Sequence, residues 1–99
     1  MKTPKCNSLE EVRDAIDLLD DQIVQLIAKR NSYIKQAASF KDTVDEVKSQ
    51  ERIDYVIQKA RAKALEYNLS PNLIEDLFHT MINEMVDTEI AEFRNAKDL

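Results

Sequence analysis

Apolar residues recur at alternating steps of four and three between residues 9 and 41, which is the spacing of one face of an α-helix. Arg30 stands within this stripe, and Lys41 follows its last member directly. The pattern predicts one long amphipathic helix over residues 9–41 with two positive charges on or beside its apolar face. The apolar members of the stripe are Val12, Ile16, Leu19, Ile23, Leu26, Tyr33, Ala37 and Phe40.

The length of this helix favours an oligomer. About 33 helical residues extend roughly 50 Å, whereas a compact chain of this size has a radius of gyration of about 13 Å. Much of the apolar stripe would then stay in water, and soluble monomers rarely expose contiguous apolar patches larger than a few hundred Å². We therefore expect a partner chain to cover the stripe, most simply in an obligate homodimer.

Local signals mark the start of the long helix and of the next one. Ser8 and Glu11 form a capping-box sequence, in which Ser8 accepts from the amide of Glu11 while the Glu11 carboxylate accepts from the amide of Ser8. The apolar period lapses over residues 42–48, which are expected to form a loop. Ser49 is then expected to cap a second helix.

Two further amphipathic helices complete the chain. The first is expected over about residues 50–67, with Asn68 ending it in the left-handed conformation because the chain has no glycine to offer. Ser70 and Pro71 are suited to the cap and first position of a third helix. This helix is expected to be ordered to about Phe93 and to fray beyond it.

Composition supports an all-α chain that forms a single domain over residues 1–99. The sequence contains no glycine and two prolines, and its formal net charge of −5 argues against a partner such as nucleic acid or an anionic membrane surface. Cys6 is the only cysteine, so no intramolecular disulfide is possible. No leader peptide and no apolar run of about 20 residues is recognisable, and a cytoplasmic location is expected.

Two ionisable residues interrupt the inward faces. Arg30 does so in the long helix, and Glu89 does so in the third helix, between Met85 and Phe93. Buried charges are costly unless paired, and one such residue alone usually reaches the surface or a neighbouring opposite charge. Two of them, with Lys41 adjoining, favour a binding site.

The spacing of the positive charges predicts the kind of ligand. Arg30 and Lys41 would lie roughly 16 Å apart along the helix axis, so their side chains can bracket a small dicarboxylate. Arg13 would lie roughly 42 Å from Lys41 along a straight helix and cannot reach the same ligand. If Arg13 binds this ligand, an antiparallel partner helix must supply it.

Several short segments, taken together and in their order along the chain, resemble the all-helical (type II) chorismate mutase family. The resemblance extends over nearly the whole chain. The resemblance implies an intertwined homodimer of three-helix chains, with two active sites that each use the long helices of both chains. It implies a chorismate-type substrate and neither a cofactor nor a metal. The segments are Val12-Arg13-Asp14-Ala15-Ile16-Asp17, Leu19-Asp20, Lys29-Arg30, Phe40-Lys41 and Gln50-Glu51-Arg52.

The resemblance also implies residue roles. Arg13 of one chain and Arg30 of the other would hold the two substrate carboxylates, and Glu51 would bind the ring hydroxyl. The catalytic residues would be Lys41 and Glu89, both at the ether oxygen. The predicted substrate-binding residues are Arg13, Arg30, Glu51 and Met85.

Departures from the family pattern leave the reaction open. Val47 and Gln50 stand where many of these mutases have an Asp and an Arg, and Glu89 stands where a catalytic glutamine is common. The segment Met1-Lys2-Thr3-Pro4 with Cys6, and the Phe40-Lys41 ending, resemble isochorismate-pyruvate lyases on the same fold. We favour the rearrangement of chorismate to prephenate, with elimination of pyruvate from isochorismate to leave salicylate as the alternative. A further alternative is a non-catalytic module for dimerisation or metabolite sensing.

Either reaction is pericyclic and needs no nucleophile. The site would select a reactive conformer and place positive charge where negative charge grows on the breaking ether bond, chiefly through Lys41. Loss of Arg30 is expected to weaken binding, and loss of Lys41 to reduce turnover. Glu89 can donate a hydrogen bond to the ether oxygen only when protonated, and its burial and the charge of Lys41 act on that protonation in opposite directions.

Overall fold

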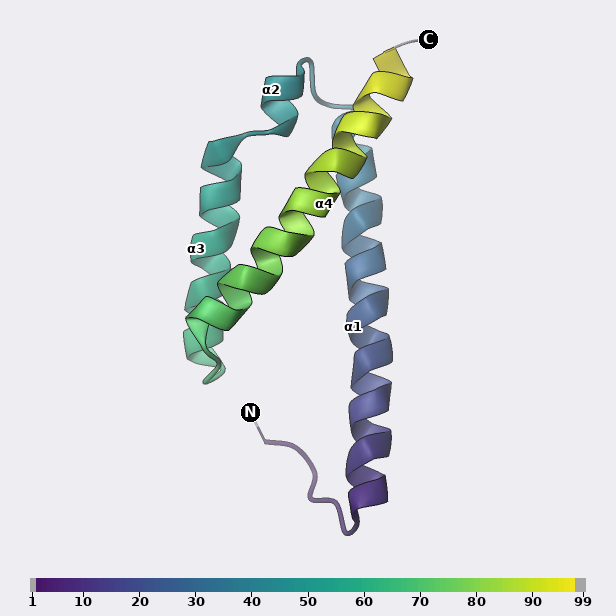
Figure 1. The fold of residues 1–99 in the computed structure, drawn as a ribbon, viewed down its shortest axis with the longest axis vertical. Coiled ribbons are helices and arrows are strands. Elements are labelled where there is room, and N and C mark those ends of the chain that lie inside the picture. The colour runs from purple at the N-terminus through teal and green to yellow at the C-terminus, as the bar shows by residue number, and fades with distance from the viewer. Residues whose placement is uncertain (1, 98–99) are drawn as a thin grey trace. The chain divides into compact units, whose positions relative to one another are not determined.

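The computed structural model describes residues 2–97 and confirms the all-helical class, with no strand in that range. Three long helices and one short one make up the chain (Figure 1). In chain order the elements are α1 (Leu9–Ala38), α2 (Val44–Val47), α3 (Gln50–Glu66) and α4 (Pro71–Lys97).

The chain separates into two compact units, Met1–Tyr33 and Ile34–Leu99. The first holds the N-terminal lead and most of α1. The second holds the end of α1 and the other helices. The assignment of residues 1–99 to one domain stays a prediction.

At the start of α1, one of the two hydrogen bonds predicted for the capping box is formed. The amide of Glu11 donates to Ser8 Oγ at 3.0 Å, as predicted. The Glu11 carboxylate instead accepts from the amide of Asn7 at 2.7 Å, so the expected bond to the Ser8 amide is wrong. The helix still gains a side-chain partner for one of its first amides.

The predicted end of the long helix at residue 41 is wrong by three residues. The amides of Ser39, Phe40 and Lys41 each donate to the carbonyl three positions back, which tightens the last turn, and Ser39 Oγ also donates to the Gln36 carbonyl at 2.8 Å. Phe40 therefore leaves the helical stripe and is 83% exposed. Lys41 lies beyond the helix, so its axial distance from Arg30 cannot be calculated from helical rise.

The segment predicted as a loop, residues 42–48, contains the single helical turn α2. Thr43 Oγ1 accepts from the amide of Glu46 at 3.2 Å and caps the turn. Glu46 Oε2 accepts from the amide of Asp42 at 2.8 Å. This is the arrangement found at the start of α1, where the glutamate also bonds the residue before the cap.

The caps of α3 and α4, and the turn between these two helices, agree with their sequence signals. Ser49 Oγ accepts from the amide of Arg52, and Ser70 Oγ accepts from the amide of Leu73, so both caps are confirmed. Asn68 has a φ of 59°, and the amide of the following Leu69 donates to a carbonyl one turn back in α3 at 2.8 Å. This is a Schellman ending built on asparagine.

This ending allows a stability prediction. Asn68→Ala should lower the free energy of unfolding by about 1 kcal/mol, because a Cβ without a local polar partner disfavours the left-handed conformation. Asn68→Gly should be at least as stable as the wild type in urea denaturation. Equal stability of the alanine variant would show that the backbone strain is relieved elsewhere.

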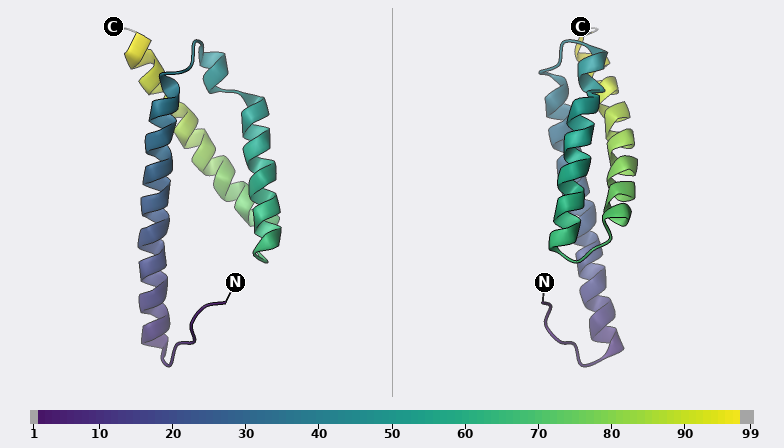
Figure 2. Two further views of the ribbon diagram at one scale, coloured as in Figure 1. Left: turned by 180° about the vertical axis from the view of Figure 1, so that it is seen from behind. Right: turned by 90° about the vertical axis from the view of Figure 1, so that its left-hand side faces the viewer.

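Helices α3 and α4 pack against each other and are joined by this turn (Figure 2). Helix α4 continues to Lys97, so the predicted end at Phe93 is wrong, while Leu99 lies outside the described residues. A small core at the other end of α4 joins Ala38, Val47 and Phe93. This core fixes the connection between α1 and α3 against α4.

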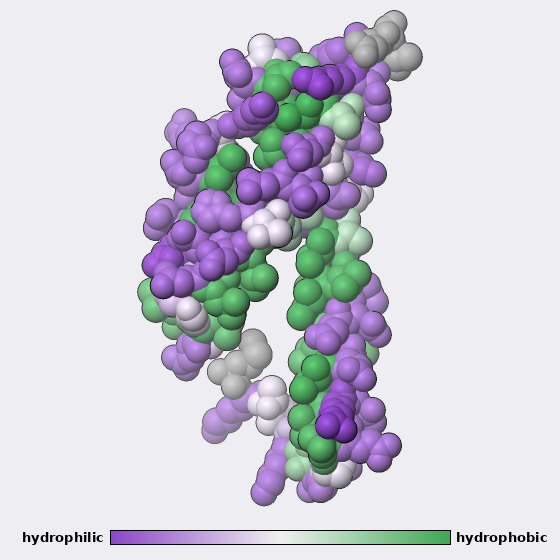
Figure 3. Space-filling view, in the orientation of Figure 1, coloured by the Kyte–Doolittle hydropathy of each residue, from purple (hydrophilic) through white to green (hydrophobic). Residues whose placement is uncertain are grey.

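Most of α1 remains exposed. Within the first unit, Figure 3 shows apolar side chains following the helix, and Ile23 and Leu26 are 53% and 64% exposed. The apolar stripe predicted from the sequence is thus uncovered in the single chain. None of the helices in residues 2–97 combines the length and apolar composition needed to cross a lipid bilayer.

Candidate functional site

A partly buried ion pair joins two of the predicted site residues. Lys41 Nζ lies 3.4 Å from Glu89 Oε2, although 48 positions separate them in sequence. Lys41 lies just beyond α1, and Glu89 lies in the second half of α4. The structure therefore brings together the two residues expected at the ether oxygen.

The surrounding core explains this pairing. Ala38 and Val47 lie on either side of Lys41 in sequence, and both pack against Phe93, one turn after Glu89 on α4. Burial of these three apolar side chains holds the connection onto the face of α4 that carries Glu89. The ammonium group of Lys41 is then within reach of the carboxylate.

The pair is mostly removed from water. The side chain of Glu89 is 7% exposed and that of Lys41 is 28% exposed. A buried carboxylate is costly without a partner, and its attraction to a cation is stronger there than at the surface. This arrangement holds a positive charge at a defined position that stays partly open to a ligand.

Lys41 has a second partner that the sequence analysis did not identify. Its Nζ donates to the backbone carbonyl of Glu46 at 3.2 Å. A backbone carbonyl leaves no trace in the sequence, but the signal Thr43-Val44-Asp45-Glu46 resembles a capping box and indicates the turn that presents it.

Met85 and Glu51 belong to the same unit as the ion pair. Met85 lies one turn before Glu89 on α4 and is 5% exposed, so it is part of the interior next to the carboxylate. Glu51 is exposed in the first turn of α3. Their roles in binding a substrate stay predictions.

Arg13 and Arg30 lie in the first unit, on α1. Arg13 is exposed near the start of the helix, and Arg30 is half-buried toward its end. The predicted dicarboxylate site joins residues of both units. The contribution of these two arginines therefore stays a prediction.

Two of the departures from the family pattern, at Val47 and Gln50, have structural counterparts. Val47 is 6% exposed and packs in the apolar core, so its side chain offers no polar group to a ligand. Gln50 donates from Nε2 to Asp54 Oδ1 at 2.9 Å, one turn along α3. The chain uses both positions for its own structure.

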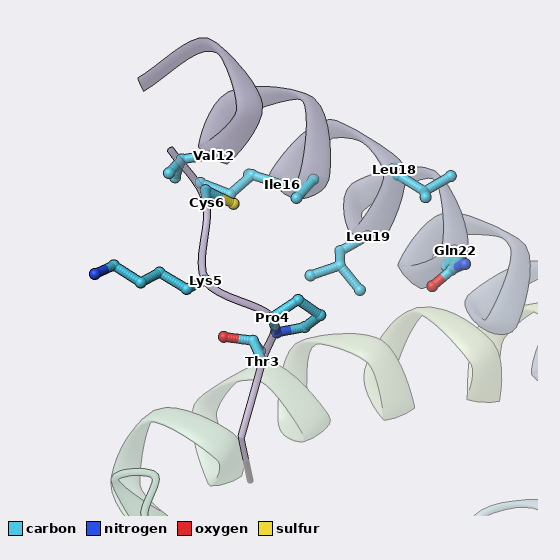
Figure 4. Close-up of a pocket in the computed structure, with 10 residues that line it drawn as sticks. Thr3, Pro4, Lys5, Cys6, Val12, Ile16, Leu18, Leu19 and Gln22 are labelled. Carbon is cyan, nitrogen blue, oxygen red and sulfur yellow. The ribbon is translucent and has the colours of Figure 1, made fainter. Parts of the chain in front are cut away.

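An apolar pocket of about 660 Å³ lies in the first unit, between the N-terminal lead and α1. Figure 4 shows Cys6 beside Val12 and Ile16, Pro4 facing Leu19, and the amine of Lys5 pointing away. Cys6 is a half-buried free thiol. The pocket carries no arrangement of acid, base and nucleophile.

Within residues 2–97, no three His, Cys, Asp or Glu side chains lie close enough together to hold a metal ion.

Comparison with known proteins shows similarity over most of the chain. The family model described as chorismate mutase type II matches residues 12–90. The chain is 32% identical over 98 residues to an isochorismate pyruvate lyase of Pseudomonas aeruginosa, covering 98% of this chain and 97% of that protein. It is 33% identical over 75 residues to a chorismate mutase of Methanocaldococcus jannaschii, covering 75% and 76% of the two chains. It is also 33% identical over 87 residues to a bifunctional chorismate mutase/prephenate dehydratase of Buchnera aphidicola, covering 87% of this chain and 23% of that protein.

Proposed function

The chain belongs to the type II chorismate mutase family, and on that premise we propose that it rearranges chorismate to prephenate. The observation that carries the proposal is the Lys41–Glu89 pair, in which a cation and a carboxyl group meet at 3.4 Å in a mostly buried position. Lys41 would stabilise negative charge on the ether oxygen as the carbon–oxygen bond breaks. The reaction needs neither a nucleophile nor a cofactor.

The remaining predicted residues would hold the substrate. Arg30 and the Arg13 of a second chain would bind its two carboxylates, because guanidinium groups form paired hydrogen bonds with carboxylates. Glu51 would bind the ring hydroxyl, and Met85 would form part of the apolar wall. Binding in one reactive conformer supplies much of the rate enhancement in a unimolecular rearrangement.

A homodimer is part of this proposal. The uncovered stripe on α1 needs a partner, and a second copy offers the same apolar surface. Charge supports an antiparallel arrangement, in which the acidic half of one α1 faces the basic half of the other. The acidic half carries Glu10, Glu11, Asp14, Asp17, Asp20 and Asp21, and the basic half carries Lys29, Arg30 and Lys35. For a protein of this kind we also propose a cytoplasmic location.

A second candidate reaction is the elimination of pyruvate from isochorismate to leave salicylate. The observation that favours it is the extent of similarity to the Pseudomonas aeruginosa lyase, which spans 98 residues and includes the N-terminal lead. The similarity to the Methanocaldococcus jannaschii mutase spans 75 residues. The same cation would assist both reactions, since each breaks an ether bond.

The assay that separates these reactions uses both substrates. The pure protein should convert chorismate to prephenate with the larger kcat/KM when it is incubated separately with chorismate and isochorismate. Salicylate and pyruvate formed from isochorismate with the larger kcat/KM would reverse the choice. A folded protein that converts neither substrate would be the non-catalytic module instead.

The Glu89→Gln variant tests what the reaction needs at this position. Lys41 Nζ lies 3.4 Å from Glu89 Oε2. An amide in place of this carboxyl group can donate a hydrogen bond to the departing ether oxygen, whereas a carboxylate can only accept. If such donation assists bond breaking, kcat of Glu89→Gln should equal or exceed that of the wild type.

Steady-state kinetics of the two proteins decide the role of Glu89. A kcat of Glu89→Gln well below that of the wild type would show that this position does not serve as a hydrogen-bond donor. Its carboxylate would then serve to orient Lys41, as the ion pair suggests. Thermal unfolding of both proteins controls for a change in stability.

A further inference from the structure

We propose that Glu46 is a positioning residue for Lys41, acting through the turn that joins Lys41 to Val47. The inference rests on the proposed function, because it concerns the ammonium group that the proposed reactions need. Lys41 Nζ donates to the Glu46 carbonyl at 3.2 Å and lies 3.4 Å from Glu89 Oε2. Residues on two different elements therefore hold the same nitrogen.

A lysine side chain needs such support to act as a fixed charge. Its four-carbon stem is flexible, and its ammonium group has three hydrogens to donate. Within residues 2–97, the acceptors for Lys41 Nζ are the Glu46 carbonyl and the Glu89 carboxylate. The third hydrogen is left for an oxygen atom of the substrate.

Glu46 contacts three consecutive residues with three different groups. Its carbonyl accepts from Lys41 Nζ, its carboxylate accepts from the amide of Asp42 at 2.8 Å, and its own amide donates to Thr43 Oγ1 at 3.2 Å. The carboxylate bond closes the turn on the side nearest Lys41. The direction of the Glu46 carbonyl, and with it the position of Nζ, depends on that closure.

A substitution at Glu46 can weaken the turn while Val47 still holds the turn against the core. Val47, the next residue, is 6% exposed and packs in the core with Ala38 and Phe93. Glu46 is exposed, so its side chain can be shortened without leaving a cavity. Glu46→Ala keeps the carbonyl but releases the Asp42 amide, and Glu46→Gln keeps an oxygen that can accept from it.

The first test compares kcat and KM of these variants. Glu46→Ala should lower kcat by about tenfold, less than loss of Lys41 itself, while KM changes by less than about twofold. Glu46→Gln should retain kcat within about twofold of the wild type. Asp45→Ala is the matched control, because Asp45 has the same charge on the same turn and its side chain makes no hydrogen bond or ion pair within the described chain.

The second test asks whether Glu46 acts through Lys41. In the Lys41→Ala background, Glu46→Ala should change kcat by less than about twofold, since the group that it positions is gone. A full tenfold loss in that background would overturn the proposal. So would a wild-type kcat in Glu46→Ala alone, or a loss in Asp45→Ala as large as that in Glu46→Ala.

Amide hydrogen exchange separates this inference from the proposed function. The Asp42 amide should be protected in the wild type and in Glu46→Gln, and should exchange freely in Glu46→Ala. If the wild type is active and the Asp42 amide exchanges equally in all three proteins, the positioning role of Glu46 is wrong and the proposed function stands. If the wild type converts neither chorismate nor isochorismate, the proposed function fails and the positioning role fails with it, whatever the exchange pattern.

Discussion

Lys41→Ala should lower kcat by roughly 10²-fold or more, because loss of one donor to a developing oxyanion costs about 3 to 4 kcal/mol of transition-state stabilisation. The effect should fall mainly on kcat rather than on KM, since the interaction strengthens as the ether bond breaks. Steady-state kinetics on chorismate and isochorismate measure it. Lys48→Ala, which removes an exposed lysine from the same connection, should leave kcat near the wild-type value.

The ion pair requires a further control for this variant. Lys41→Ala leaves the buried Glu89 carboxylate without its cation, which destabilises the surrounding fold. The double variant Lys41→Ala/Glu89→Gln removes that charge, and its helicity and melting temperature should approach those of the wild type. A kcat that also recovered would show that Lys41 serves the fold and not the reaction.

Mixing Arg13→Ala chains with Lys41→Ala chains should restore activity that neither protein has alone. In the proposed antiparallel dimer, one site of each mixed dimer receives both substitutions and the other receives neither. Random assembly places half of the chains in mixed dimers, so activity should reach about a quarter of the wild-type value. Joint refolding from denaturant, followed by an activity assay, measures this recovery.

The matched control is a mixture of Arg30→Ala and Lys41→Ala chains. These two residues would serve a site from the same chain, so every site in a mixed dimer carries one substitution and activity should stay low. Equal recovery in both mixtures would contradict the assignment of Arg13 to the partner. A folded monomer at micromolar concentration in sedimentation would contradict the dimer itself.

Local sequence signals determined the three long helices and four of their six ends. Ser49, Asn68 and Ser70 act on amides and carbonyls within about one turn, so their effects can be predicted without the rest of the chain. The repeat of apolar residues likewise identified the face of α4 on which Glu89 is buried, and the stripe of α1 that the single chain leaves exposed. The likeness to the chorismate mutase family was also readable from segments in α1, in the connection after it and at the start of α3.

Some local signals were present and competed with the periodicity. Phe40 continues the apolar repeat, but the bonds of Ser39 to Gln36 end α1 before it. Thr43 and Glu46 form a cap within a segment that has lost its apolar period. The apolar repeat is a property of several helical turns, whereas the residue at which a helix ends depends on one or two hydrogen bonds.

The resemblance placed Lys41 and Glu89 at one oxygen atom. Only the tertiary structure decided that they pair directly within one chain and that Lys41 also meets the Glu46 carbonyl. The first pair is 48 positions apart, and the second involves a backbone group that every residue type possesses. A hydrophobic period specifies which face of a helix must be covered, because burial of apolar surface is non-directional. It does not specify which element covers that face, and this choice places the ammonium group of Lys41 beside the carboxylate of Glu89.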